Sequence, residues 1–140
     1  MQLEADLVLE LNVEVGENLD VGKTPGGFLR LIPIIGGTFS GPNIKGKVIP
    51  GGYDCNTAVN DEQAHAFAKY AIQTDDGVYI SVENEGYLDL KAQDYIVKTM
   101  PRFQVADGKY EWLRNGVFVG SLEAGQTKKP SVCIKIYKMK

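Results

Sequence analysis

The sequence predicts an all-β protein that folds into a closed antiparallel β-barrel of about eight to ten strands. Apolar residues alternate with polar ones in several runs, which is the pattern of strands with one buried face. Turn signals such as Asp76-Gly77 and Asn115-Gly116 recur at short spacing between these runs. No segment has the pattern of a long helix, and closure into a barrel removes the exposed edges that so many strands would leave.

The N-terminal part of the chain is predicted to hold two strands separated by a loop. Residues Asp6 to Val15 alternate strictly, with leucine or valine at every odd position from residue 7, and are predicted to form a half-buried strand. Gly16 to Gly27 is rich in glycine and is predicted to be a loop, long enough to be functional or mobile. Phe28 to Ile35 is predicted to be the second strand, interrupted by Pro33.

A glycine-rich stretch from Gly36 to Asp54 organises the predicted fold. It holds six of the 16 glycines, too many for a helix, yet Phe39, Ile44 and Val48 keep it apolar at regular intervals. We therefore predict two short strands joined by a tight turn and bent at both ends by glycine, with Asp54 just past the second bend. Such bends are how a sheet turns a corner to close on itself.

The middle of the chain is predicted to form a hairpin. Cys55 to Gln63 is polar and turn-like. Ala64 to Thr74 carries alanines that suit a helix, but alternation in its second half favours a strand leading into the turn at Asp76-Gly77. The returning arm begins at Val78 and is expected to end at Asn84-Glu85-Gly86.

The same rules give the C-terminal elements of what is predicted to be a single domain, residues 1–140. They are a loop or short turn at Leu88 to Asp94, a strand from Tyr95 to Val105, a helical turn at Lys109 to Leu113, a strand at Val117 to Gly120, a polar loop from Glu123 to Pro130 and a final strand from Ser131 to Met139.

Composition and charge exclude several classes of protein. The net charge of −3, from 18 acidic and 15 basic residues, gives no electrostatic footprint for nucleic acid. Cys55 and Cys133 lie far apart and outside any CxxC pattern. Because the start of the chain does not look like a signal peptide, we expect a cytoplasmic protein with two free thiols. No segment approaches the ~20 apolar residues of a membrane helix, so no membrane partner is expected.

Asp54 and Arg102 are the candidate charged residues of a site. A carboxylate at a barrel mouth can bind a polar ligand group or act as a base, and the alternative for Asp54 is a turn cap. Arg102 lies within an apolar strand and can clamp a carboxylate with two hydrogen bonds. Its alternatives are a solvated side chain or a structural ion pair, with Asp54 itself as one conceivable partner.

Tyr70, Tyr110 and Trp112 are the candidate aromatic residues. Each offers a large apolar face and a polar group with which to hold an aromatic ligand, and the alternative for each is a place in the core or in a plug that closes the barrel. His65 is the only histidine, whereas a zinc site needs three or four ligands. The sequence also contains no phosphate loop or dinucleotide fingerprint, so neither a metal nor a cofactor is predicted.

Four blocks of the chain form a specific combination. They are Gly36-Gly37-x-Phe39-x-Gly41-Pro42-x-Ile44-x-Gly46-x-Val48-x-Pro50-Gly51-Gly52-x-Asp54; Tyr70-x-Ile72-x-Thr74-x-Asp76-Gly77-x-x-Ile80; Pro101-Arg102-Phe103 with Tyr110-x-Trp112-Leu113 and Val117-Phe118-Val119-Gly120; and Ile134-x-Ile136-Tyr137. Together they cover roughly Leu3 to Tyr137 and resemble the family named domain of unknown function 3237. The resemblance implies a small bacterial antiparallel barrel, lipocalin-like in outline, in a largely uncharacterised group. Cys55 stands where the family pattern usually has an aromatic residue, which implies a roomier or differently shaped cavity if that aromatic lines it.

Three functions from different classes remain open at this point. The first is a binding module that holds a small, mostly apolar or aromatic-acid ligand in the barrel. The second is a metal-independent enzyme of isomerase or cyclase type, with Asp54 as base or acid, Arg102 as anion clamp and Tyr70 as hydroxyl donor. The third is a solidly packed barrel that acts as a structural or homodimeric interaction protein. A solvent-open cavity on which these three side chains converge distinguishes the first two functions from the third.

Overall fold

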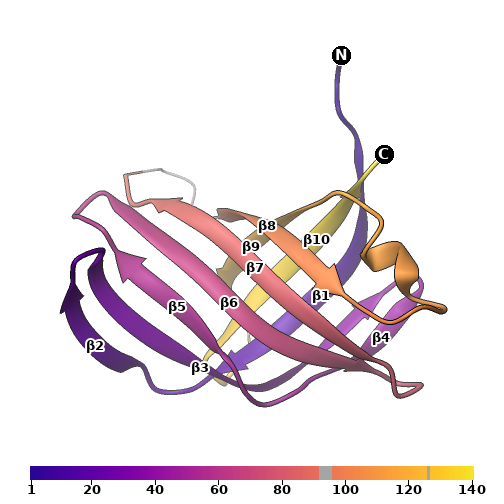
Figure 1. Cartoon of the computed structure of the whole chain (residues 1–140), viewed down its shortest axis with the longest axis horizontal. Coiled ribbons are helices and arrows are strands. Elements are labelled where there is room, and N and C mark those ends of the chain that lie inside the picture. Colours follow the sequence, from indigo (N-terminus) through magenta and orange to yellow (C-terminus); the bar gives the residue numbers. More distant parts are fainter. Residues whose placement is uncertain (92–95, 126) are drawn as a thin grey trace.

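The computed structural model describes residues 1–91, 96–125 and 127–140, which contain ten strands and one short 3₁₀ helix, η1 (Glu111–Leu113). The strands are β1 (Ala5–Val15), β2 (Leu19–Thr24), β3 (Gly27–Gly41), β4 (Ile44–Val48), β5 (Tyr53–Ala58), β6 (Gln63–Thr74), β7 (Tyr79–Asp89), β8 (Val97–Gln104), β9 (Phe118–Ala124) and β10 (Ser131–Met139). All ten belong to one sheet, and paired strands run antiparallel (Figure 1).

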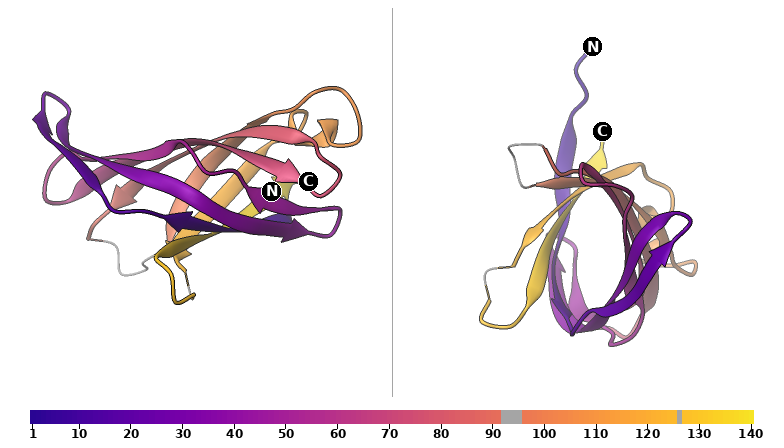
Figure 2. Two further views of the ribbon diagram at one scale, coloured as in Figure 1. Left: turned by 90° about the horizontal axis from the view of Figure 1, so that it is seen from below. Right: turned by 90° about the vertical axis from the view of Figure 1, so that its left-hand side faces the viewer.

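The sheet closes on itself because β1 pairs with a strand on either side. Residues 5–14 of β1 pair with β10, and residues 10–15 pair with β3. β4 and β5 lie end to end between β3 and β6, so together they fill one strand position. Eight positions therefore surround the barrel axis, and β2 extends the wall beside β3 at one end (Figure 2). The predicted closed antiparallel barrel is confirmed.

Most predicted strands are confirmed, and three boundaries differ for a shared reason. The predicted loop from Gly16 to Gly27 contains β2, and the first part of the predicted turn at Cys55 to Gln63, residues 55–58, belongs to β5. β7 also continues past Asn84 as far as Asp89. In these places glycine or polar residues occupy strand positions, because pairing with neighbouring strands outweighs their weak local preference. The predicted segments at 88–94, 95–105 and 123–130 each lie partly outside the described residues.

Two pairs of glycines shape the predicted corner. Gly36 and Gly37 have φ of +149° and +134° and sit beside a bulge, where the pairing of β1 with β3 skips Ile35. The bulge lets Ile34 and Phe39 both point inward although they are five residues apart. The first short strand predicted in the glycine-rich stretch is therefore continuous with the strand predicted from Phe28, and together they form β3. Gly51 and Gly52, also at positive φ, separate β4 from β5. The tight turn and the two glycine bends were predicted correctly.

The inside of the barrel is unevenly filled. One half is packed with large side chains, among them Leu9, Phe39, Ile72 and Ile136, all nearly or fully buried. The segment after β8 folds across this end, where Leu113 and Tyr110 are buried as a plug. Towards the other end the inward positions of β6 hold Ala64, Ala66 and Ala68 instead. The core therefore occupies one half of the barrel and leaves the other half open for a site.

The glycine bulge gives a test of the fold. We expect Gly37→Ala to lower the free energy of unfolding by about 2–3 kcal/mol or more, because a Cβ there would clash with the Asn12 carbonyl oxygen and φ is strained for any other residue. Urea denaturation measures the loss. Gly26→Ala is the matched control, with Thr24 Oγ1 at 3.9 Å as the nearest atom, and should change stability by less than about 0.5 kcal/mol. Equal stability of the two variants would contradict the observed pairing of β1 with β3.

Candidate functional site

A cavity of about 200 Å³ occupies the open half of the barrel. Its wall is mostly apolar, formed by the inward faces of β1, β3, β9 and β10 on one side and of β5 to β8 on the other. Asn18, in the connection between β1 and β2, also borders it. The right-hand view of Figure 2 looks at the barrel from this end, opposite the plug. The cavity is thus closed at its inner end by the core.

Small side chains create the cavity. Ala66, Gly86, Thr99 and Gly120 follow one another across β6, β7, β8 and β9 as directly paired residues. Ala68 and Asn84 form the next such row towards the plug, with Tyr70 on the row after that. A strand pairing brings the side chains of opposite residues to the same face of the sheet. These rows therefore form a stretch of wall with short side chains, where larger residues would have filled the barrel.

Four buried polar atoms on the cavity wall have no hydrogen-bond partner within the described residues. They are Asp54 Oδ1, Tyr70 OH, Asn84 Oδ1 and Thr99 Oγ1. Leaving a buried polar atom unsatisfied costs about 1–3 kcal/mol, so native proteins contain few of them. Their gathering on one wall of one cavity therefore marks this cavity as the candidate site.

Burial sets the protonation of the two titratable groups in this wall. It raises the pKa of the Asp54 carboxyl, and a backbone hydrogen bond from Phe67 and the charge of His65 oppose that rise only in part. Burial, together with the nearby Asp54 charge, also raises the pKa of Tyr70 well above its usual range. Tyr70 is therefore a neutral hydroxyl that can donate a hydrogen bond, and among the described residues no lysine, arginine or histidine lines the cavity with it.

The structure brings Asp54 and Tyr70 together but removes Arg102 from the site. Arg102 follows inward-facing Pro101 and precedes inward-facing Phe103, so its own side chain points outward. It lies opposite Glu83 of β7 on the outer wall. The predicted convergence of Arg102 with Asp54 and Tyr70 is wrong, because residue 102 falls on the outward face of β8 and only its two neighbours face inward. Arg102 and Asp54 are therefore not partners.

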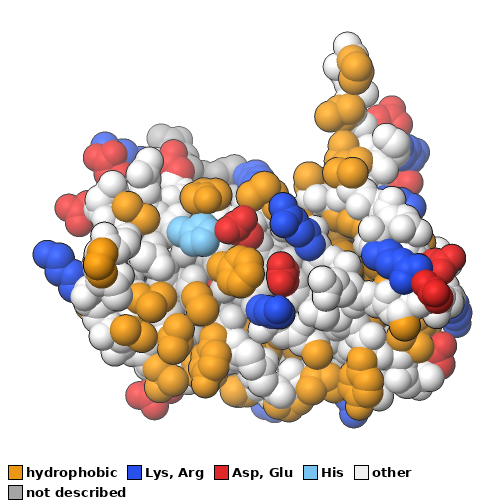
Figure 3. Space-filling model, viewed as in Figure 1, with side chains coloured by type: hydrophobic (Ala, Val, Ile, Leu, Met, Phe, Trp, Pro, Cys, Tyr) orange, Lys and Arg blue, Asp and Glu red, His pale blue; other side chains and the backbone are white. Residues whose placement is uncertain are grey.

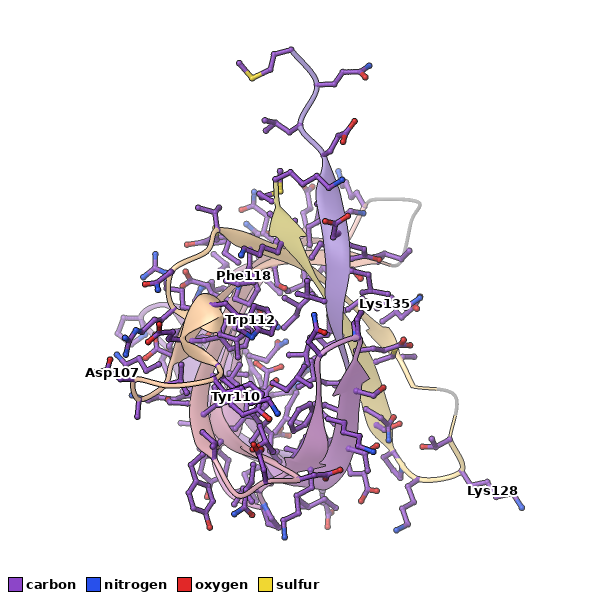
Figure 4. The ribbon with its side chains drawn as sticks, turned by 90° about the vertical axis from the view of Figure 1, so that its right-hand side faces the viewer. Asp107, Tyr110, Trp112, Phe118, Lys128 and Lys135 are labelled. Carbon is purple, nitrogen blue, oxygen red and sulfur yellow. The ribbon has the colours of Figure 1, made fainter. Side chains whose placement is uncertain are left out.

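Tyr110 and Trp112 lie at the plugged end, away from the cavity (Figure 4). The Tyr110 hydroxyl donates a 2.7 Å hydrogen bond to Asp76 Oδ1 in the β6–β7 turn. Trp112 packs near Phe118, with their ring centroids 6.5 Å apart. Their positions match the alternative of a plug that closes the barrel, and they take no part in lining the cavity.

Asn84 and Thr99 are the site residues that sequence analysis missed. Asn84 was assigned to a strand end, and Thr99 was one polar residue in a strand. A signal was nevertheless present. Alanines at 64, 66 and 68 fall on one face of a strand, and small residues on an inward face indicate a cavity rather than a packed core.

The remaining chemically active residues lie elsewhere. His65 is on the outer wall, where its Nε2 lies 2.8 Å from Glu85 Oε2 and its ring packs near Tyr87. This face mixes hydrophobic and charged side chains (Figure 3). Cys55 and Cys133 are free thiols, and no cluster of metal-ligating side chains exists in the described part of the chain.

Among the described residues, no helix is long and apolar enough to cross a membrane. The helix η1 has only three residues.

A larger hollow of about 720 Å³ lies over the outer wall of β1, β3 and β10. It is an open, charged groove bordered by Glu10, Lys45 and Lys135, and none of the four unpartnered buried atoms belongs to it. Size alone therefore does not identify the site, and the smaller interior cavity is the better candidate.

Comparison with known proteins agrees with the barrel and leaves the activity open. The family described as protein of unknown function (DUF3237) matches residues 3–139. A UPF0311 protein of Rhodopseudomonas palustris is 34% identical over 133 residues, which are 85% of this chain and 87% of that protein. The crystal structure of a conserved protein of unknown function from Rhodopseudomonas palustris has a TM-score of 0.89 and 30% identity, covering 100% of this chain and 99% of that one. An enzyme from Penicillium herquei, 24% identical with a TM-score of 0.76 over 100% and 96% of the two chains, shares the fold.

The raised pKa of Asp54 predicts how stability depends on pH. The folded protein binds this proton more tightly than the unfolded chain, whose pKa is 3.8, so the carboxylate destabilises the fold as pH rises through the folded pKa. We expect Asp54→Asn to be more stable than the unmodified protein at pH 7, by about 1.4 kcal/mol for each pH unit between the two pKa values. The gain should vanish below the unfolded pKa.

Urea denaturation from pH 3 to pH 8 measures this difference. Asp61→Asn, at an exposed position, is the control and should show no gain at pH 7. If Asp54→Asn follows the same pH profile as the unmodified protein, the Asp54 carboxyl is not held in a desolvated site.

Proposed function

The chain belongs to the DUF3237 family of proteins of unknown function, and we propose that its barrel binds one small, mostly apolar molecule that carries hydrogen-bonding groups. One observation carries this proposal: four unpartnered polar atoms share the wall of a single apolar cavity. A hollow half of the interior also favours a ligand-binding protein over a solidly packed barrel. The cytoplasmic location and a homodimer stay predictions.

The size of the cavity limits the ligand. A cavity of about 150 Å³ is enough for a benzene ring, so about 200 Å³ suits one ring with small substituents. Apolar side chains such as Val13 and Ile134 contact the body of the molecule, while Asp54, Tyr70 and Asn84 offer the polar contacts. Hydrogen bonds to otherwise unsatisfied buried groups give such a site its specificity.

The charge of the wall decides which end of a ligand lies inside. In the part of the chain that the structure describes, the wall offers one buried carboxyl and neutral acceptors or donors, and it has no cation. A carboxylate placed deep in the cavity would lose its hydration without gaining a positive partner. The innermost part of the ligand is therefore a neutral group, such as a hydroxyl or a carbonyl.

A partly filled cavity should weaken binding. We expect Ala68→Leu, which adds three carbons to the cavity wall, to weaken the binding of phenol by at least about tenfold, or about 1.4 kcal/mol. Ala71→Leu makes the same change on the outward face of β6 and should leave phenol binding unaltered. Saturation-transfer NMR measures binding, and circular dichroism verifies that both variants fold. Equal binding by the two variants would place the ligand elsewhere.

The natural ligand is best sought by native mass spectrometry of the protein purified from its own host. A small molecule that co-purifies with the protein, but not with Ala68→Leu, identifies the ligand class directly. This comparison is informative because the two proteins differ only at the cavity wall.

A metal-independent enzyme of isomerase type is the second candidate. The observation that favours it is the raised pKa of Asp54 beside the neutral Tyr70 hydroxyl, because a desolvated carboxyl and a hydroxyl donor form an acid–base pair. In this hypothesis Asp54 removes a proton next to a carbonyl group and Tyr70 donates a hydrogen bond to the carbonyl oxygen.

Proton exchange tests the second candidate without a known substrate. If the pair is catalytic, acetophenone in heavy water should exchange its methyl protons at least about 100-fold faster with the protein than without it, as followed by NMR. Asp54→Asn should lose the acceleration. Exchange that is equally fast with both proteins, or absent with both, would leave ligand binding as the function.

A further inference from the structure

An arginine that sequence analysis passed over stands at the open end of the cavity. On β3, Ile34 and Ile32 face inward and line the cavity, and Arg30 occupies the next position on that same face. Arg30 pairs directly with Asn56 of β5, which pairs in turn with Ala66 of the cavity wall. The register therefore places Arg30 at the mouth, one step outward from Ile32.

The guanidinium of Arg30 is held near the mouth and keeps hydrogen-bonding capacity. Its Nε lies 3.8 Å from Asp20 Oδ1, and its Cζ lies 5.3 Å from the ring centroid of Phe28. The side chain is 45% exposed. Within the described residues its two terminal nitrogens make no hydrogen bond, and a guanidinium with free terminal nitrogens can take a carboxylate with two parallel bonds.

We propose that Arg30 recognises an acidic group on the ligand, so that the molecule is a small monoacid with an apolar, ring-sized body. The inference rests on the proposed function. Arg30 lies two residues, about 6.6 Å, outward from the Ile32 row that holds Asp54. A ring with substituents at opposite ends spans this separation. Its hydroxyl or carbonyl end reaches the buried polar atoms, and its carboxylate stays in water at Arg30.

This orientation fits the charges on both sides of the mouth. The described lining of the cavity holds a buried carboxyl and no cation, so an acid would be repelled inside and attracted outside. Asp20 is the carboxylate paired with Arg30, and the distance of 3.8 Å between them is longer than a direct hydrogen bond. A ligand carboxylate can therefore compete for the guanidinium.

Two probes of similar size test the proposal. By isothermal titration calorimetry at low salt, the protein should bind 4-hydroxybenzoate about three- to tenfold more tightly than the neutral 4-hydroxybenzyl alcohol, because the arginine is partly exposed. Arg30→Gln should remove this preference while leaving the alcohol unaffected. Arg30→Lys should retain part of it, and Asp20→Asn should strengthen it. The preference should shrink as salt is added.

Arg102→Gln is the matched control, since it removes an arginine from the outer wall. It should leave both affinities unchanged. If the alcohol binds but the acid is not preferred, or if Arg30→Gln keeps the preference, the role of Arg30 is wrong and the cavity proposal stands. A preference for the acid that is lost with Arg102→Gln would also overturn the role of Arg30. If neither probe binds, the cavity proposal fails and this inference fails with it.

Discussion

The interior of an eight-stranded barrel is just wide enough for its own side chains to fill it, so the sizes of the inward side chains decide whether any cavity exists. In this protein Leu9, Phe39 and Ile72 fill one half, whereas Ala66, Ala68 and Gly86 leave the other half hollow. The backbone is the same closed ring in both halves. The site is therefore a property of side-chain size on an otherwise continuous wall.

The hollow half brings a cost in stability that the packed half must offset. Asp54, Tyr70, Asn84 and Thr99 each bury a polar atom that no other described residue satisfies. A hydrophobic residue of similar size at any of these positions would avoid that penalty. Groups that destabilise the folded chain and share one cavity are typical of binding and catalytic sites, where a ligand supplies the missing partners.

The sequence predicted the architecture better than the site, and particular residues show why. The alternation in β1 and the Asp-Gly turn between β6 and β7 are local signals, so they could be interpreted without the rest of the chain. Which face of β8 points inward depends on its pairing with β7, and this placed Arg102 outside although its neighbours are buried. Arg30 was overlooked for the same reason, because only the pairing of β3 with β5 shows that it shares a face with the cavity. Asn84 and Thr99 are ordinary strand residues until neighbouring strands bring them together.

The plug at η1 has a kinetic consequence. The hydrogen bond from Tyr110 to Asp76 ties the plug to the β6–β7 turn, and Leu113 beneath it is almost fully buried. A molecule in the cavity must then arrive and leave by the end of the barrel opposite the plug. The width of that route changes the association and dissociation rates by the same factor and leaves the affinity unaltered. The wall around Asp54 and Tyr70 instead sets the affinity. The residues along the route therefore set how fast the cavity fills and empties, while the wall sets how tightly it holds a molecule and so also affects the dissociation rate.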